Sequence, residues 1–448
     1  MSTDRHGGWL AGPLGGIVLR PWFDRMALIM MVKGYFPTSR LWAAAEVAGD
    51  NPDRFFADAP MPRLPAREKD RLIGVLRMAS AARERAVQAE GAWRKVMFEN
   101  KAGGDPVESE TWRRQASFAN MATRTKFQPW RTKAPPIKFD TVPPHLAERR
   151  FGEFREQPGT YFRPVETEVE VSRSLVRNGV VERWLRFDCP HSDVGGTVWA
   201  HVFEPEDGYD HTVVMCHGVG MEAELWGEGY HMAPPLVARG LRVIEPEAPW
   251  HSRRRPAGVH GGEPFMARGI VGAMELFGSH VREIGALVGW ARETSEGKVA
   301  VGGISLGALN SQLAVNHCAS WPDAMRPDAA MFVTTTDRLD EVALDSAFAK
   351  GFSAMAALEQ AGWDRAKVQS WMPLVAPLGE PGVDPDRIVM ALGTADTITP
   401  YRGGSAFARR WRIPPENLLE SWQGHFSKAF GLARDPAPIE RLCAILRS

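Results

Sequence analysis

The spacing of hydrophobic and polar positions changes on either side of a proline-rich stretch at residues 133–164. Before it, apolar residues recur at helical spacing over residues 63–101, and residues 21–49 are apolar with scattered charges. After it, short apolar runs alternate with amphipathic stretches. This pattern predicts an N-terminal helical accessory region with a proline-rich linker over residues 1–164, followed by an α/β domain over residues 165–448.

The runs after the linker predict the order of strands and helices. ETEVEVSRSL, VERWLRFDC and TVWAHVFEP are separated by turn signals, which favours an antiparallel entry to a sheet. The later runs are almost continuously apolar, as in strands buried on both faces of a parallel sheet. They are HTVVMCH, LRVIEPE, VAVGGI, AAMFVTT, RIVMALG and NLLESWQG. An apolar stripe over residues 265–294 predicts a long helix. We therefore expect an α/β fold with a mostly parallel eight-stranded sheet flanked by helices, and a site at the carboxyl ends of its strands.

One run leads directly into a serine framed by glycines. The sequence VAVGGISLGALNSQ places Gly303-Ile304-Ser305-Leu306-Gly307 between a predicted strand and a predicted helix. A G-x-S-x-G pentapeptide at such a junction is typical of a nucleophile elbow. The turn is so tight that side chains at both glycine positions would collide with the neighbouring strand and helix. It also raises the Ser305 hydroxyl above the sheet and points the helix N-terminus at a developing oxyanion.

A serine nucleophile needs a base, and the base needs an orienting carboxylate. VMALGTADTITP places Asp396 just beyond a predicted strand, and LESWQGHFS places His425 after the last strand-like run. The order serine, acid, histidine is the one that follows this elbow. The other downstream histidine, His317, falls in the helix after the elbow. We predict Ser305, Asp396 and His425 as catalytic residues, with Asp337 as a reserve acid.

The loop after an earlier strand supplies a second candidate for the oxyanion hole. His217-Gly218-Val219-Gly220 follows the run HTVVMCH. We expect the backbone N–H groups of Val219 and Leu306 to bracket the oxyanion, with Gly218 allowing the chain to approach closely. His217 is a candidate for contact with the substrate.

Three consecutive arginines follow the run LRVIEPE. Arg253, Arg254 and Arg255 are expected near the rim of the site, where a guanidinium can pair with a carboxylate or phosphate of the substrate. Internal salt bridges to nearby acidic residues explain them equally well, and both interpretations stay open.

A helix-forming insertion at residues 338–386 separates the runs AAMFVTT and RIVMALG. It contains Phe348, Phe352, Trp363 and Trp371. These aromatic residues indicate a cap over an apolar acyl pocket, although ordinary core packing would explain them too.

The net charge and its distribution along the chain indicate which classes of partner to expect. The 448 residues carry 54 basic and 54 acidic side chains, so no global field directs the protein to nucleic acid, and we expect none as a partner. Residues 61–150 carry 19 Lys and Arg against 10 Asp and Glu. A solvated helical face explains this excess, and a surface for an anionic partner is the alternative.

The spacing of the cysteine and histidine residues bears on whether the protein forms disulfides or binds a metal. The four cysteines show no CxxC spacing and read as reduced thiols. No secretory pattern opens the sequence and no apolar run approaches a membrane span, so we expect a cytoplasmic protein. We expect no cofactor. We also expect no metal, because metal-ligand spacing is absent among the histidines at 201, 211, 217, 231, 251 and 260.

Taken together, these motifs resemble the alpha/beta hydrolase superfamily over roughly residues 165–448. More narrowly, the chain is similar to the alpha/beta hydrolase domain-containing protein 18 family in EAPWHSRRRP, GGISLG, the helix at 265–294 and the N-terminal segment MVKGYFPTSRLW. That resemblance implies a serine hydrolase of lipid acyl esters, found in eukaryotes at mitochondria. The chain differs in its basic stretch and lacks a clear transit peptide, so localisation and substrate do not carry over.

The sequence therefore predicts a serine hydrolase that cleaves small-molecule carboxylic esters, apolar or lipid-like, through an acyl-enzyme. Two alternatives stay open. One is an acyltransferase or peptidase that uses the same three residues, and the other is a non-catalytic scaffold that binds a membrane or partner. Peripheral lipid contact and a homo-oligomer are candidate associations.

Overall fold

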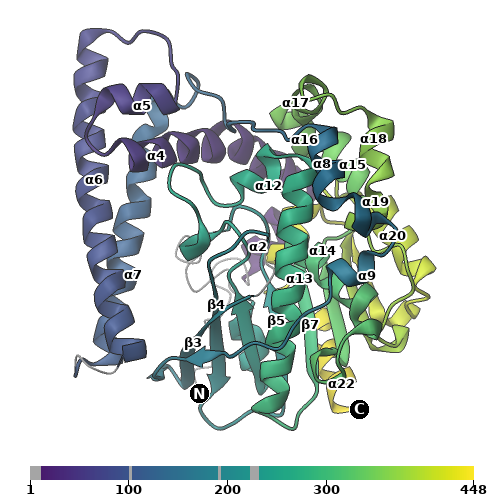
Figure 1. Cartoon of the computed structure of the whole chain (residues 1–448). Coiled ribbons are helices and arrows are strands. Elements are labelled where there is room, and N and C mark those ends of the chain that lie inside the picture. Colours follow the sequence, from purple (N-terminus) through teal and green to yellow (C-terminus); the bar gives the residue numbers. More distant parts are fainter. Residues whose placement is uncertain (1–11, 100–102, 190–192, 222–231) are drawn as a thin grey trace.

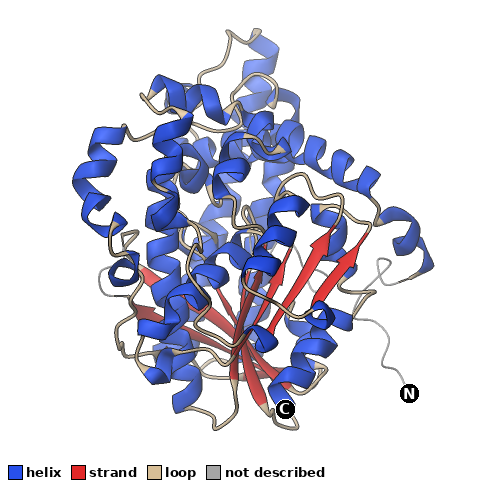
Figure 2. Cartoon of the chain, turned by 90° about the vertical axis from the view of Figure 1, so that its right-hand side faces the viewer, coloured by secondary structure: helices blue, strands red, loops and turns tan. Residues whose placement is uncertain are grey.

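The computed structural model describes residues 12–99, 103–189, 193–221 and 232–448. At its centre is a twisted sheet with helices against both faces (Figures 1 and 2). The eight longer strands are β3 (Val180–Asp188), β4 (Thr197–Pro205), β5 (His211–Cys216), β6 (Leu241–Pro246), β7 (Val299–Ile304), β8 (Ala329–Val333), β9 (Ile388–Gly393) and β10 (Leu418–Ser421). Two short strands, β1 (Glu170–Val171) and β2 (Leu175–Arg177), pair with β3.

The strand order places the parallel strands at the centre and at one edge of the sheet. It runs β1-β3-β4-β6-β5-β7-β8-β9-β10, with β3, β4 and β6 antiparallel to their neighbours in turn and all pairs from β6 to β10 parallel. The predicted fold class is confirmed. Over the described residues the sheet has ten strands rather than eight, because β1 within the run ETEVEVSRSL and β2, which begins at its last residue, are two separate short strands that both lie along β3.

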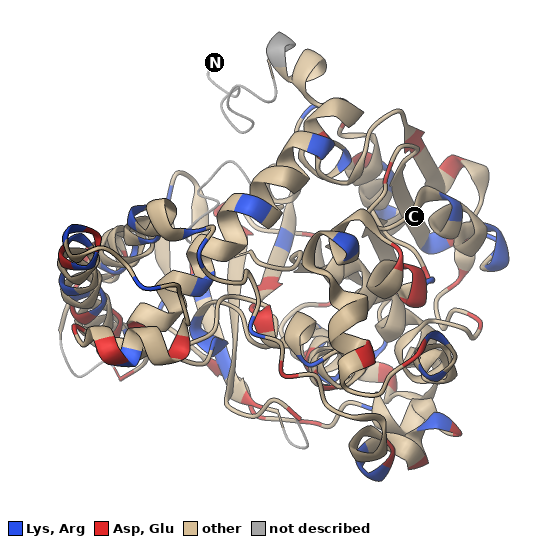
Figure 3. Cartoon of the chain, turned by 90° about the horizontal axis from the view of Figure 1, so that it is seen from above, with Lys and Arg blue, Asp and Glu red and all other residues tan. Residues whose placement is uncertain are grey.

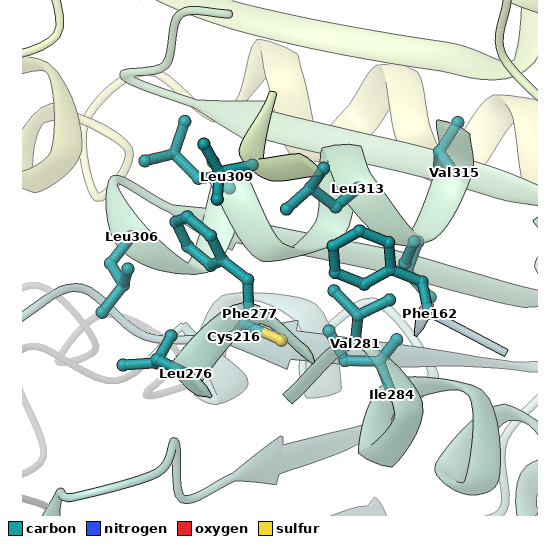
Figure 4. Packing of buried hydrophobic residues seen from close by; sticks show 14 of the residues in the cluster. Phe162, Cys216, Leu276, Phe277, Val281, Ile284, Leu306, Leu309, Leu313 and Val315 are labelled. Atoms are coloured by element: carbon teal, nitrogen blue, oxygen red, sulfur yellow. The ribbon is translucent and has the colours of Figure 1, made fainter. Parts of the chain in front are cut away.

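Two apolar clusters pack against opposite faces of the sheet, because alternate residues of a strand point to opposite sides. On β5, Val214 and Cys216 face the helices α13 (Ile270–Glu293) and α14 (Leu306–His317). Figure 4 shows this side, where Phe277 lies beside Cys216. Val213 and Met215 face the other way, toward α11 (Ala233–Val237) and α22 (Ala437–Arg447).

The predicted long helix is present, but it begins at a different residue and is buried more completely than expected. It is divided into α12 (Glu263–Ala267) and α13, with Gly269 between them at a positive φ of 63°. The whole of α13 up to Ala291 is buried rather than one stripe. The linker covers its outer side so closely that a Cβ at Gly278 would lie 2.3 Å from the Tyr161 hydroxyl oxygen.

The N-terminal helices lie against the sheet edge and over its top. They are α2 (Pro13–Val18), α3 (Pro21–Met30), α4 (Phe36–Ala48), α5 (Pro52–Asp58), α6 (Ala66–Arg94), α7 (Pro106–Ala122), α8 (Pro144–Phe151) and α9 (Pro158–Tyr161). The α6–α7 pair joins the sheet through Trp93, whose ring lies 5.1 Å from that of Trp184, and through an Arg114–Glu182 ion pair of 2.9 Å. Basic and acidic residues are mixed along this pair (Figure 3).

Residues 338–386 form a layer of short helices beside the carboxyl ends of the strands (Figure 1). These helices are α15 (Leu339–Leu344), α16 (Ala347–Phe352), α17 (Ala354–Gln360), α18 (Arg365–Ser370) and α19 (Met372–Val375). The last helices around the sheet are α20 (Tyr401–Arg410), α21 (His425–Gly431) and α22. Among the described residues, no helix has both the length and the apolar character needed to cross a bilayer.

Candidate active site

Ser305 lies on the sharp turn between β7 and α14. Its backbone is at φ 56° and ψ −117°, a strained conformation for a residue with a side chain. Both flanking glycines are required by sterics. A Cβ at Gly303 would lie 2.3 Å from the carbonyl carbon of Gly307, and a Cβ at Gly307 would lie 2.1 Å from the carbonyl oxygen of Cys216. The turn therefore has the geometry that the pentapeptide predicted.

The structure brings the three predicted residues together. His425 Nε2 lies 2.9 Å from Ser305 Oγ, and His425 Nδ1 lies 2.8 Å from Asp396 Oδ2. The three side chains come from the turn after β7, the loop after β9 and the start of α21. Both His425 and Asp396 are buried, so the hydrogen bonds between them are shielded from water. The arrangement can pass a proton from the serine hydroxyl to the imidazole.

Asp396 is held by donors that sequence reasoning missed. Its Oδ1 accepts hydrogen bonds from the backbone N–H groups of Ile398 at 2.8 Å and Thr399 at 3.0 Å, and its Oδ2 accepts one from the Thr399 hydroxyl at 2.8 Å. Thr399 Oγ1 also lies 3.1 Å from His425 Nδ1. The motif DTIT carries this signal, since an aspartate followed by threonine three residues later is a common turn pattern.

The predicted oxyanion loop lies against the serine. A Cβ at Gly218 would be 3.7 Å from Ser305 Cβ, and Gly218, Val219 and Leu306 all line the cavity that contains Ser305. Leu306 is the first residue of α14, so its N–H has no acceptor within the helix. Both residues predicted to supply N–H donors therefore line the cavity that contains the serine.

Two histidines, of which His251 is buried, hold this loop in place. His217 Nε2 accepts from the Ala248 N–H at 3.1 Å, and its Nδ1 lies 2.8 Å from the Gly218 carbonyl oxygen. His251 Nε2 accepts from the Gly220 N–H at 3.1 Å. Burial, and then the nearby His217, keep the pKa of His251 well below its ordinary value, so it stays a neutral acceptor. The suggested substrate contact of His217 is therefore not what the structure favours, because both ring nitrogens face backbone groups.

The three arginines form internal ion pairs, and none lines the cavity. Their carboxylate partners are Glu90 and Glu247 for Arg253, Glu283 for Arg254, and Glu46 for Arg255. The Arg254 pair is bidentate, with both N···O distances at 2.7 Å. Because two of the partners lie on α4 and α6, the arginines tie the N-terminal helices to the loop after β6. The salt-bridge interpretation thus replaces the substrate-binding one.

The other candidate residues lie away from the serine. Asp337, the reserve acid, forms an ion pair with Arg410. His317 stacks on Phe162 of the linker, with ring centroids 4.7 Å apart, and burial lowers its pKa to about 4. His231 lies outside the described residues. Among those described, no group of three or more His, Cys, Asp or Glu side chains could hold a metal ion.

A cavity of about 900 Å³ opens beside Ser305 and His425. Its walls are mainly apolar and come from several parts of the chain, including the loops and helices around β5, β6 and β7. The insertion contributes Leu339, Val342, Phe348, Phe352 and Leu358, the C-terminal part contributes Ile398, Phe426 and Phe430, and the N-terminal part contributes Met31, Ile137 and Phe139. By contrast, Trp363 and Trp371 of the insertion are buried in the core. Phe348 and Phe352 thus line the cavity, whereas Trp363 and Trp371 pack in the core. That the insertion caps an acyl pocket stays a prediction.

Comparison with known proteins bears on the fold alone. No family model matches the sequence, and no curated protein does. Similar solved structures include an acetyl xylan esterase from Paenibacillus sp. R4, with 14% identity over 69% of this chain and 96% of that one and a TM-score of 0.47. A cold-adapted esterase from an Arctic intertidal metagenomic library has 13% identity over 61% and 97%, and a TM-score of 0.38. The Pyrococcus horikoshii acylaminoacyl peptidase has 11% identity over 63% and 48%, and a TM-score of 0.40. The narrower family resemblance stays a prediction.

Proposed function

We propose that the protein is a serine hydrolase that cleaves carboxylic esters with an apolar acyl group through an acyl-enzyme. The observation that carries this proposal is the hydrogen-bonded chain from Ser305 through His425 to Asp396 at the wall of an apolar cavity. A serine in a strained turn, a base on its hydroxyl and a carboxylate on the base together form the arrangement that acyl transfer needs.

In the proposed reaction, Ser305 Oγ attacks the ester carbonyl while His425 Nε2 accepts the hydroxyl proton. The N–H groups of Val219 and Leu306 stabilise the negative charge on the carbonyl oxygen. The C–O bond to the leaving alcohol then breaks as His425 returns the proton to that oxygen. A water molecule then attacks the acyl carbon while His425 takes its proton. The bond from the acyl carbon to Ser305 Oγ breaks as His425 returns that proton to Ser305 Oγ, which releases the carboxylic acid and restores the serine. Asp396 remains ionised and holds the imidazole tautomer.

The cavity supports an apolar acyl group as substrate. Its lining is dominated by Leu, Ile, Phe and Met side chains, and each methylene moved from water into such a lining is worth about 0.8 kcal/mol. We therefore expect kcat/KM to rise with acyl chain length until the cavity is filled.

A fluorophosphonate probe tests the proposal directly. Wild-type protein should be labelled at one serine, and Ser305→Ala should not be labelled. The same two proteins are then assayed on p-nitrophenyl esters of increasing chain length. If a folded wild type neither reacts with the probe nor cleaves any ester, the hydrolase proposal fails and the scaffold alternative takes its place. Adding an alcohol or amine during turnover separates hydrolysis from acyl transfer, because a transferase would give the new ester or amide.

We also propose that the protein makes peripheral contact with lipid, through one face of α3. Trp22, Met26, Ile29 and Met30 on this face are all exposed, as is Arg25 at its edge, and Lys33 is exposed just beyond the helix. The next residue after α3, Met31, lines the cavity. Apolar side chains with flanking basic residues suit the interface of an anionic membrane.

Vesicle binding tests this contact independently of catalysis. Trp22→Glu should weaken co-sedimentation with anionic vesicles, whereas Trp112→Glu on α7 should not, although the two tryptophans are 51% and 46% exposed. Equal binding by both variants would overturn the lipid proposal. Dimerisation of the wild type that Trp22→Glu abolishes would instead assign the face to a second copy of the chain. The cytoplasmic location stays part of the proposal, supported by the four cysteines, which show no CxxC spacing in the sequence.

A further inference from the structure

Asp24 on α3 contacts the start of α21, although the two lie about 400 positions apart in the sequence. Asp24 Oδ1 accepts hydrogen bonds from the backbone N–H groups of Phe426 at 2.6 Å and Ser427 at 3.1 Å. Asp24 Oδ2 accepts a third from the Ser427 hydroxyl. The side chain thus caps the helix that begins at His425.

This cap comes from outside because the local sequence does not provide one. The residue before α21 is Gly424, which has no side chain to accept from the first N–H groups of the helix. Asp24 takes that place. Ser427 Oγ, which donates to Asp24, also accepts from the Gly424 N–H at 2.8 Å. The residues on both sides of His425 are therefore connected to one carboxylate.

The contact is close enough to constrain the sequence at this point. A Cβ at Gly424 would lie 2.4 Å from Asp24 Cγ, so a side chain there would displace the carboxylate. Further along α21, the rings of Phe23 and Phe430 meet edge to face with centroids 6.2 Å apart. These neighbours hold α3 against α21 around the Asp24 bonds.

We infer that Asp24 is a positioning residue for His425, so that the N-terminal segment forms part of the active site. This inference rests on the proposed function. Asp396 orients the imidazole ring through Nδ1, but it does not restrain the backbone that carries the ring. Asp24 supplies that restraint through Phe426 and Ser427. Proton transfer from Ser305 depends on the Nε2 position to within about 0.5 Å, so a looser backbone slows the chemical step.

Steady-state kinetics on a short p-nitrophenyl ester test this inference with three variants. Asp24→Ala removes all three acceptor bonds and should lower kcat about 10- to 100-fold, with KM changed less than threefold. Asp24→Asn keeps an oxygen that accepts from both backbone N–H groups and should retain most of the activity. Asp105→Ala is the matched control. Asp105 caps α7 through the Val107 N–H at 2.9 Å, far from the site, and its loss should leave kcat unchanged.

Fluorophosphonate labelling separates positioning from a merely structural role. If Asp24 positions His425, Asp24→Ala should still be labelled to the wild-type stoichiometry, but more slowly. A reduced labelled fraction that reacts at the wild-type rate would mean that Asp24 only stabilises the fold, and would overturn the inference. Wild-type kcat in folded Asp24→Ala would do the same.

If Asp24→Ala is insoluble, Asp24→Ser replaces it, since the shorter side chain weakens the cap without removing it. The inference is then judged by the same labelling and kcat outcomes, measured on Asp24→Ser. Failure of the wild type to react with the probe would overturn the proposed function together with this inference. Labelled, active wild type beside an unaffected Asp24→Ala variant would overturn this inference alone.

Discussion

The serine turn and the histidine loop meet at one hydrogen bond but are built in different ways. The serine turn is constructed mainly by its neighbours in sequence, since β7, Gly303, Gly307 and α14 all lie close along the chain. Contacts from elsewhere include the close approach of Cys216 and the hydrogen bond from the Ser305 N–H to the Val333 carbonyl oxygen at 3.0 Å. The histidine loop follows a four-residue strand and begins a seven-residue helix, and its cap is Asp24. Short helices are marginal alone, so this one depends on tertiary contacts.

This difference shows that two members of one proposed active site need not be equally tolerant of change in the rest of the protein. Substitutions in the N-terminal helices should leave the serine turn intact and disturb the histidine. Substitutions at the elbow glycines should disturb the fold itself. The predictions below test this contrast, together with Asp24→Ala above.

The largest effect is expected for Ser305→Ala. Loss of the nucleophile should lower kcat by about 10⁴-fold or more. The melting temperature should stay close to the wild-type value, because the Ser305 hydroxyl bonds only to His425 among the contacts described above. Ester turnover and thermal unfolding are measured side by side. Residual activity within tenfold of the wild type would remove Ser305 from the reaction.

Gly307→Ala tests whether the turn is determined sterically. The added methyl group meets the Cys216 carbonyl oxygen, so we expect the free energy of unfolding to fall by about 3–5 kcal/mol. Gly74→Ala on the exposed side of α6 is the control. A Cβ there meets nothing within 4 Å, and alanine should stabilise the helix by up to about 1 kcal/mol. Denaturant unfolding compares them, and equal stability of both variants would contradict the steric explanation.

We expect the protein to become less stable as the pH is lowered, because a histidine is partly buried where α14 packs against the linker. Burial holds the pKa of His317 at about 4 in the folded protein, below the ordinary 6.5 of the unfolded chain. Above pH 6.5 the residue is neutral in both states and contributes no pH dependence. As the pH falls from 6.5 to 4, protonation favours the unfolded chain, by up to about 3 kcal/mol.

The free energy of unfolding of wild type and of His317→Asn is measured at pH 7 and at pH 4.5. The contribution of His317 is the difference between the two proteins in the slope of this free energy against pH. Comparing slopes removes the effect of other titrating groups and of any stacking lost with Phe162. If both proteins lose the same free energy between the two pH values, His317 is not responsible.

The smallest effect is expected for Thr399→Val, which removes one hydroxyl from Asp396 and preserves the side-chain shape. A hydrogen bond to a charged group contributes about 1.5–3 kcal/mol to stability, so we expect the free energy of unfolding to fall by up to that amount and kcat to fall about tenfold, while KM changes little. Thr394→Val in the same loop, where the hydroxyl bonds a backbone carbonyl at 3.3 Å, should have no effect on kcat. Equal kcat for the two variants would show that Thr399 does not support Asp396.

The fold was predictable because its strands are almost continuously apolar and its helices amphipathic. These patterns can be recognised along the sequence without knowing how the side chains pack. The serine turn was predictable because both glycines are adjacent to it. Asp396 and His425 followed from their order and from the strands that precede them. Thr399 was within reach of the same reasoning, since it lies in the motif that identified Asp396.

The contact partners of the three arginines, of His251 and of Asp24 could not be predicted from the sequence. Arg253, Arg254 and Arg255 stand where a site rim was expected, and only the folded chain brings carboxylates from α4, α6 and α13 to them. His251 carries no spacing signal that relates it to Gly220, yet it accepts that residue's N–H.

By itself, then, the sequence determined the alternation of strands and helices, the strained serine turn and the order of the candidate residues, because short-range periodicity and sterics act between near neighbours. The tertiary structure alone decided the partners of each charged side chain, the shape of the cavity and the cap of α21. These depend on which distant surfaces meet. Asp24 and Phe426 lie 402 positions apart, and only the docking of α3 against α21 brings that carboxylate to the helix that carries His425.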